Sequence, residues 1–310
     1  MILAIVGPTA TGKTAYSLRV VEAIRAGLIG PWRDAEIVNA DSMQLYRGMD
    51  IGTAKATPAE RALVAHHQLD VLHVSQAASV AAYQRAARAT IAEIIQRGHL
   101  PIVVGGSGLY IRALLDKISL PGTNPQVRAH YRRRLEREGA AVLHGELLER
   151  DARAGAKISV GDPRRIVRAL EVMDITGKPF SAHMPTRAYV QPTVQIALRV
   201  APEILHKRIG ARTAAMWQAG IVAETASLRD AMGPTAAHAT GYAQCMDYLD
   251  GKCDQDACIE AITIATRQLA RKQRTWFRAD PRITWLDASA VTQPVAAVLA
   301  PLLTADLNGN

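Results

Sequence analysis

The chain has 310 residues, of which 49% are hydrophobic and 5% aromatic, and its net charge is +9. This length supports a mainly aliphatic core in one large or two modest domains, and the charge suits a polyanionic partner as well as an ordinary basic surface. A disulfide framework and a membrane span are excluded, because there are only 3 cysteines and no long apolar run. Cys245, Cys253 and Cys258 lack the spacing of a zinc site, so we predict buried thiols in a reducing compartment, the cytoplasm.

Strands and helices alternate in the first third of the chain. Apolar runs at 2–6, 35–40 and 100–106 are typical of strands that are covered on both faces. A helical pattern follows the first run, another begins after Ser79, and a third continues from the last run to Leu115. This alternation predicts an α/β fold with a parallel sheet flanked by helices.

A break at 119–125, rich in proline and glycine, interrupts this alternation. The basic segment that follows has helical patterns and no strand until 193–200, which we expect to rejoin the sheet. We therefore predict a core domain of residues 1–118 and 191–310 and a helical, basic insertion domain of residues 119–190. A last strand is expected at 282–287, and the tail beyond Leu303 is expected to be frayed.

The stretch GPTATGKT fits the complete P-loop pattern between an apolar strand and a helix. Its backbone N–H groups would surround phosphate oxygens, Lys13 would reach the terminal ones, and the Thr14 hydroxyl would hold Mg²⁺. The predicted phosphate-binding residues are Gly7, Pro8, Thr9, Ala10, Thr11, Gly12, Lys13 and Thr14. A guanine-reading motif is missing, and the strand at 100–106 ends in glycines where many ATPases place an acid. A small-metabolite kinase therefore remains an alternative, in which Asp41 would orient an acceptor hydroxyl or Mg²⁺.

Several longer motifs point to one family. GPTATGKT, NADSMQLYRGMDIGTAK, HHQLDV, PIVVGGSGLYIRALL, DPRRIVRALEV and TRQLARKQRTWFR occur in this order. With them the chain resembles the tRNA dimethylallyltransferases, or tRNA isopentenyltransferases, in their short bacterial-type form. The resemblance implies a P-loop NTPase-like fold. It also implies transfer of a dimethylallyl group from its diphosphate to the exocyclic amine of the adenosine immediately 3′ of the anticodon. The P-loop would then bind the leaving diphosphate, with Mg²⁺ as cofactor, instead of a nucleotide.

The resemblance also implies roles for single residues. Asp41 matches the family's acid and would accept a proton from the adenine amine, Thr9 matches a reaction-centre hydroxyl, and Arg212 matches a diphosphate contact. The stretch Asp41, Ser42, Met43 and Gln44 matches the base-contacting segment, and Ser107 stands where the family has threonine beside the base. Without the resemblance, Asp41 as the cap of a turn, Ser107 as a helix N-cap and Arg212 as a solvated arginine are the simpler interpretations.

Basic residues suggest where RNA would bind. On a helix of about 100° per residue, Arg267, Arg271, Arg274 and Arg278 fall within about 60° of one another. Ile262, Ala265, Leu269 and Trp276 fall on the opposite side, which predicts a core face and a phosphate-binding face. Further predicted tRNA contacts are Arg128, Arg164, Arg165, Gly241, Tyr242 and Gln244. Ala243 stands where the family often has a basic residue.

The expected partners are the tRNA anticodon stem-loop and dimethylallyl diphosphate, with no membrane and a monomeric protein. Two alternatives remain. The first is the small-metabolite kinase, and the second is an RNA-binding protein with a vestigial P-loop.

Overall fold

The computed structural model describes residues 1–183, 187–287 and 294–308, with side chains up to Thr304 in the last helix. The chain divides into two compact units. The first comprises Met1–Leu115 and Gln191–Asn310, and the second comprises Asp116–Val190. The first unit contains the sheet, and the second unit contains helices with a hydrophobic core of their own.

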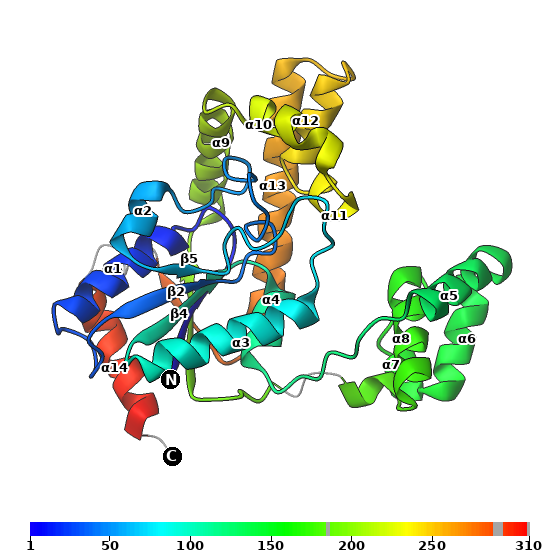
Figure 1. The fold of residues 1–310 in the computed structure, drawn as a ribbon, viewed down its shortest axis with the longest axis horizontal. Coiled ribbons are helices and arrows are strands. Elements are labelled where there is room, and N and C mark those ends of the chain that lie inside the picture. Colours follow the sequence, from blue (N-terminus) through cyan, green and yellow to red (C-terminus); the bar gives the residue numbers. More distant parts are fainter. Residues whose placement is uncertain (184–186, 288–293, 309–310) are drawn as a thin grey trace. The chain divides into compact units, whose positions relative to one another are not determined.

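A parallel six-stranded sheet in the order β3-β2-β4-β1-β5-β6 forms the centre of the first unit (Figure 1). The strands are β1 (Ile2–Val6), β2 (Ala35–Asn39), β3 (His66–His67), β4 (Leu100–Gly105), β5 (Thr193–Arg199) and β6 (Ile283–Asp287). β1 pairs with β4 on one side and β5 on the other, with Val6 opposite Gly105 and Ala197. The chain leaves the neighbouring strands β1 and β4 in opposite directions across the sheet, from β1 towards β2 and from β4 towards β5. Open α/β sheets bind ligands at such a point.

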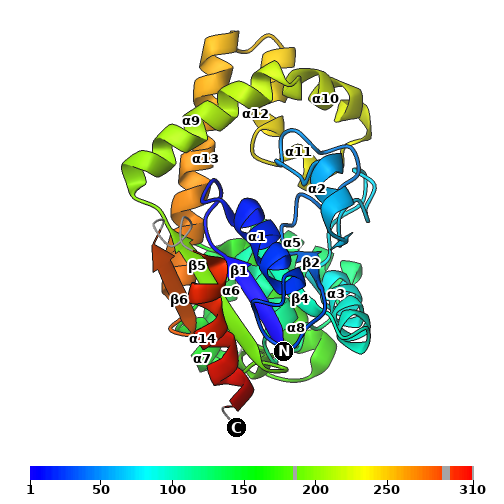
Figure 2. The same ribbon diagram turned by 90° about the vertical axis from the view of Figure 1, so that its left-hand side faces the viewer.

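Helices cover both faces of the sheet. α1 (Lys13–Arg25) and α14 (Val295–Asn308) lie on one face, and α3 (Val80–Gln96) lies on the other (Figure 2). α4 (Gly108–Leu115) lies beside α3 (Figure 1). Right-handed crossovers require this arrangement, because the chain moves across the sheet in opposite directions through α1 and α3. Alternate strand residues such as Leu3 and Ile5 pack into the core beneath α1. α2 (Pro58–Leu63) is a short helix before β3.

A helical lobe, residues 202–278, connects β5 to β6 at the carboxyl edge of the sheet (Figure 2). It contains α9 (Pro202–Gln218), α10 (Ile221–Leu228), η2 (Arg229–Ala231), α11 (Pro234–Ala237), α12 (Tyr242–Leu249) and α13 (Gln255–Arg278). Its interior includes Cys245 and Cys258, and burial raises the pKa of both thiols, that of Cys258 to about 12. These two cysteines are buried, Cys253 is half-buried, and all three are free thiols.

The second unit consists of α5 (Pro125–Glu138), α6 (Ala140–Arg150), α7 (Ala152–Gly155), α8 (Pro163–Thr176) and η1 (Phe180–His183). Side chains cap the start of three of these helices, namely Asn124 for α5, Asp151 for α7 and Asp162 for α8. Buried residues including Tyr131, Leu147 and Leu170 form its core.

The predicted α/β fold is confirmed, and so are the five predicted strands, to within one or two residues at each end. β3 was not predicted, because two residues are too few to show a periodic pattern. The tail beyond Leu303 was predicted to be frayed, but α14 continues to Asn308. Residues 309–310 of this tail lie outside the described residues. Leu299 and Leu303, earlier in α14, are buried in the core beneath α1. Within the part of the chain that the structure describes, no helix has the length and apolarity needed to cross a membrane.

Candidate active site

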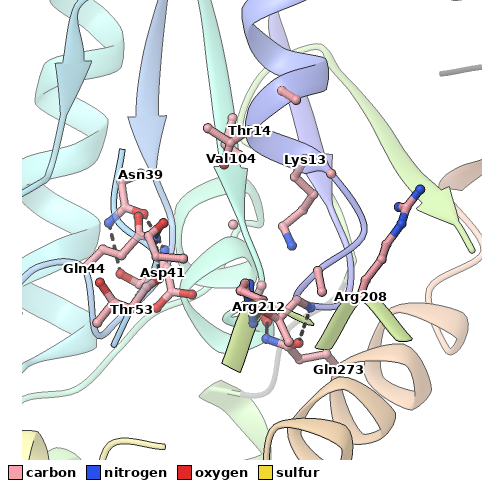
Figure 3. A pocket seen from close by; sticks show the side chains of 17 residues that line it. Lys13, Thr14, Asn39, Asp41, Gln44, Thr53, Val104, Arg208, Arg212 and Gln273 are labelled. Atoms are coloured by element: carbon pink, nitrogen blue, oxygen red, sulfur yellow. Dashed lines mark hydrogen bonds between the residues drawn. The ribbon is translucent and has the colours of Figure 1, made fainter. Parts of the chain in front are cut away.

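A pocket of about 340 Å³ lies at the carboxyl edge of the sheet. Its walls come from the P-loop, the segments after β2 and β4, and helices α9 and α13. Figure 3 shows Asn39, Asp41 and Gln44 on one side of this pocket, across from Lys13 and Gln273. The pocket thus brings the P-loop motif GPTATGKT and the motif NADSMQLYRGMDIGTAK to one site.

The P-loop has the conformation that anion binding requires. Gly7 and Gly12 have φ values of 125° and 94°, which favour glycine, and Ala10 has a φ of 63°. Gly12 precedes α1, and no side chain of the described residues caps this helix. The first N–H groups of α1 therefore remain for a ligand, at the helix end that attracts anions.

Lys13 and Arg212 supply positive charge to the pocket. Lys13 Nζ donates a hydrogen bond of 2.6 Å to the Pro8 carbonyl oxygen. Burial lowers the pKa of Lys13 to about 8, although Asp41 opposes this shift. Burial also lowers the pKa of Arg212, and Asp41 again opposes it. An arginine keeps its charge at neutral pH despite such a shift. Arg208, one helical turn before Arg212, lines the same pocket.

Thr9 is held by two helices of the lobe. Arg212 Nη2 donates a hydrogen bond of 2.7 Å to the Thr9 hydroxyl, and the Thr9 N–H donates one of 2.8 Å to Gln273 Oε1. Thr11 lies within the loop itself, where its hydroxyl donates to the Pro8 carbonyl oxygen over 3.0 Å. The structure therefore brings together the three residues that the sequence predicts to be catalytic, since Thr9, Asp41 and Arg212 all line the pocket.

Asp41 is positioned by Asn39 at the end of β2. Asn39 Oδ1 accepts the Asp41 N–H at 2.9 Å, and Asn39 Nδ2 donates to the Asp41 carbonyl oxygen at 3.0 Å. Asp41 Oδ1 accepts the Met43 N–H at 2.9 Å, so the turn that was the simpler interpretation does form. No described residue donates to Asp41 Oδ2, which leaves one carboxylate oxygen for a ligand in the pocket.

Ser107 connects β4 to the segment after β2. Its hydroxyl oxygen accepts the Ser42 N–H at 3.1 Å and lies 3.2 Å from the Ser42 hydroxyl. Ser107 also occupies the position before α4, because its carbonyl accepts the Ile111 N–H. Gln44 Nε2 donates to the Thr53 carbonyl at 3.1 Å, and both residues line the pocket. Ser42, Met43, Gln44 and Ser107 are therefore ordered beside Asp41.

Three predicted tRNA contacts in the lobe, Gly241, Tyr242 and Gln244, have structural roles within the protein. Tyr242 is fully buried, and its hydroxyl donates to Glu224 at 2.6 Å. Gly241 is buried as well, and its N–H donates to Gln244 Oε1 at the start of α12. Gly241 and Tyr242 are buried, whereas Gln244 is half-buried and uses its Oε1 to cap α12. Contact with tRNA stays a prediction for all three residues.

The three predicted contacts in the second unit differ from one another. Arg128 forms an ion pair of 2.8 Å with the buried Glu171, so its guanidinium neutralises a buried carboxylate. Arg164 and Arg165 are exposed at the start of α8. Exposure leaves the last two accessible to RNA, and contact with tRNA stays a prediction for all three.

The arginine face of α13 differs in part from the sequence prediction. Arg271 and Arg278 are exposed, while Arg267 and Arg274 are half-buried. Leu269 and Trp276 were predicted to be core residues, but they are 37% and 39% exposed. The buried side of α13 contains Ile262, Thr266, Ala270 and Phe277. The arginines thus flank the buried side rather than oppose it.

Sequence reasoning missed two polar side chains that shape the site. Gln273 on α13 binds the P-loop, and Glu224 on α10 accepts the N–H groups of Asp50, Ile51 and Gly52 at 2.9 to 3.2 Å. The segment that Glu224 holds continues directly into Thr53 and Ala54, which line the pocket. Neither residue lies in a pattern that indicates a site, although Gln273 stands inside one of the family's motifs.

The comparisons with known proteins agree with this geometry. A family model described as IPP transferase matches residues 44–280, which is most of the chain. The chain belongs to this family.

Relatives with known names support the assignment. The chain is 52% identical over 287 residues to a tRNA dimethylallyltransferase of Bifidobacterium animalis subsp. lactis, a match that covers 93% of this chain and 82% of the relative. It is 49% identical to a tRNA dimethylallyltransferase of Kineococcus radiotolerans, covering 95% and 93% of the two chains.

Solved structures give the same family. The tRNA isopentenylpyrophosphate transferase of Bacillus halodurans is 33% identical with a TM-score of 0.71, and the match covers 99% of this chain and 97% of that one. A eukaryotic dimethylallyltransferase acting on tRNA is 24% identical with a TM-score of 0.82, and the match covers 100% of this chain and 80% of that one. The two proteins share the fold.

Proposed function

We propose that this chain transfers a dimethylallyl group from dimethylallyl diphosphate to the exocyclic amine of the tRNA adenosine immediately 3′ of the anticodon, and releases diphosphate. One observation carries the proposal: in a member of the IPP transferase family, a P-loop and the carboxylate of Asp41 line a single pocket. A site with an anion-binding side and a proton-accepting side suits this chemistry.

The P-loop side stabilises the leaving group. Breaking the allylic C–O bond builds negative charge on the diphosphate oxygens, and stabilisation of developing charge is a large part of catalysis. The free N–H groups at the start of α1, the Lys13 ammonium and the Arg212 guanidinium supply the opposite charge. Arg212 and Gln273 fix Thr9. The Thr9 hydroxyl would then lie at the reacting end of the diphosphate.

The Asp41 side activates the acceptor. An adenine amine is a weak nucleophile because its lone pair is delocalised into the ring. As the new N–C bond forms, the nitrogen loses a proton, and Asp41 Oδ2 accepts it as general base. Ser42, Gln44 and Ser107 lie around Asp41 and are the groups that would hold the base. An unpaired anticodon-loop base is the kind that an enzyme moves into a pocket at least cost.

Magnesium fits the P-loop side. Among the described residues that line the pocket, Asp41 is the only acid, and no group of three or more metal-ligating side chains occurs in the described part of the chain. Mg²⁺ suits such a site, because it binds through few protein ligands together with phosphate oxygens and water. Thr14 would hold the ion, which when bound supplies positive charge to the diphosphate.

The exposed Arg271 and Arg278 of α13 and the exposed Arg164 and Arg165 of α8 provide charge for the tRNA backbone. The free thiols are consistent with a reducing compartment, and we propose that the protein acts in the cytoplasm as a monomer.

A product assay tests the proposal against its alternatives. The protein is incubated with Mg²⁺, dimethylallyl diphosphate and unmodified tRNA, and the digested RNA is examined by mass spectrometry. We expect prenylated adenosine and no requirement for ATP. Phosphorylation of a small metabolite by ATP, without prenylated RNA, would instead support the kinase alternative.

A further inference from the structure

Gln273 joins the P-loop to the end of β4. Its Oε1 accepts the Thr9 N–H at 2.8 Å, and its Nε2 donates to the Gly106 carbonyl oxygen at 3.1 Å. Gln273 comes from α13, so the contact connects three segments that are far apart in the sequence. The partners fix the direction of the amide, because a backbone N–H requires an acceptor and a carbonyl requires a donor.

The end of β4 leaves room for this amide. A Cβ atom at Gly106 would lie 2.4 Å from Gln273 Nε2, so the amide could not keep its position beside any other residue there. Val6 and Gly105 are partners in the sheet, so the P-loop and the Gly106 segment start side by side and then diverge. The Gln273 side chain binds both segments where they separate.

This contact fixes Thr9 from the lobe. The Thr9 N–H is bound by Gln273 and the Thr9 hydroxyl by Arg212, so α13 and α9 together hold the N–H and the hydroxyl of one P-loop residue. The loop's later N–H groups, from Ala10 to Thr14, follow directly from this fixed residue. Arg274, next in sequence to Gln273, belongs to the arginine face of the same helix.

We propose that Gln273 is a positioning residue that sets the conformation of the diphosphate-binding loop from α13, the helix whose exposed arginines would bind RNA. The proposal rests on the proposed function. It assigns to α13 a role on the diphosphate side of the pocket in addition to RNA binding.

The variant Gln273→Met tests this role, because methionine has similar size and neither donates to Gly106 nor accepts from Thr9. We expect KM for dimethylallyl diphosphate and Kd for inorganic diphosphate to rise roughly 10- to 100-fold, since displacement of a positioned group by about 1 Å has effects of this size. KM for tRNA should stay within about twofold. The control Gln268→Met changes an exposed residue of the same helix and should leave both constants unchanged.

Gly106→Ala perturbs the same contact from its other end. It should raise KM for dimethylallyl diphosphate and Kd for inorganic diphosphate as well. In the double variant, each constant should rise much less than the product of the two single-variant increases, because both changes remove the same contact. Thermal unfolding verifies that each variant is folded.

Two outcomes would overturn the proposal separately. If the wild-type protein transfers the prenyl group but Gln273→Met keeps KM and Kd within twofold, Gln273 has no positioning role. If the increases in KM and Kd caused by Gln273→Met and Gly106→Ala multiply in the double variant, the contact is only structural. The same holds if affinity for tRNA falls as much as affinity for diphosphate. A wild-type protein that neither binds diphosphate nor transfers the prenyl group overturns the proposed function and this inference together.

Discussion

Replacement of Asp41 by asparagine isolates its role as a base. In the structure Asp41 Oδ1 accepts the Met43 N–H at 2.9 Å, and an asparagine oxygen can accept the same bond. The Asn39 contacts involve only the backbone of residue 41, so they are also retained. Asp41→Asn therefore keeps the turn and removes only the proton acceptor.

The expected effect is a slower chemical step. A general base contributes roughly 10²- to 10⁴-fold to the rate, which corresponds to about 2.7 to 5.5 kcal/mol in the barrier. Asp41→Ala should lose this contribution as well as the turn bond, which is worth about 1 kcal/mol of stability. The difference between the two variants in the free energy of unfolding then measures the turn, and the loss of rate that they share measures the base.

Single-turnover transfer, with protein in excess over tRNA, measures the chemical step directly, and filter binding measures affinity for tRNA. We expect both variants to bind tRNA within a few-fold of wild type. A single-turnover rate for Asp41→Asn within about threefold of wild type would refute the role as a base. A loss of tRNA affinity as large as the loss of rate would make Asp41 a structural residue.

Three further predictions concern charge. Because burial holds the pKa of Lys13 at about 8, the lysine is charged below that pH and neutral above it, so affinity for dimethylallyl diphosphate should fall by up to tenfold per pH unit above about 8. Lys13→Arg should remove this part of the pH dependence, and an equal dependence in both proteins would contradict it. Arg271→Ala should lower the salt slope of tRNA binding by about 1, and an unchanged slope would exclude Arg271 from the interface. Glu224→Gln should reduce the free energy of unfolding by about 2 kcal/mol, because it weakens three charged hydrogen bonds to residues 50–52; a midpoint of urea unfolding equal to wild type would show that these bonds contribute little.

The sheet was predictable because its strands are continuous apolar runs that alternate with helices. Ile2–Val6 is fully buried, and a buried strand followed by GPTATGKT has few other interpretations. His66–His67 was not predictable, since a two-residue strand is defined by its neighbour β2 and not by its own pattern.

The errors in the helical lobe have one physical cause. A helical pattern predicts which residues share a side of α13, but not which side the neighbouring elements cover. Trp276 therefore lies half-exposed over Gly108 and Arg112 instead of in the core. The burial of Tyr242 also depends on neighbouring elements that the sequence pattern does not identify, because Glu224 and Gly52 contact its side chain.

The site was predictable where a motif places residues on one loop and not where distant helices meet. Asp41 was found through the family resemblance, and its position after β2 makes the role physically reasonable. Gln273 required the structure, because its two partners are 264 and 167 residues away in the sequence.

In the proposed reaction the P-loop binds the leaving diphosphate and not a nucleotide. The most direct test measures diphosphate release and prenylated adenosine in the same reaction, with tRNA, dimethylallyl diphosphate and Mg²⁺ but no ATP. We expect equal amounts of diphosphate and prenylated adenosine, and no stimulation when ATP is added. Prenyl transfer that depends on ATP, or phosphate transfer without any prenylated adenosine, would contradict it.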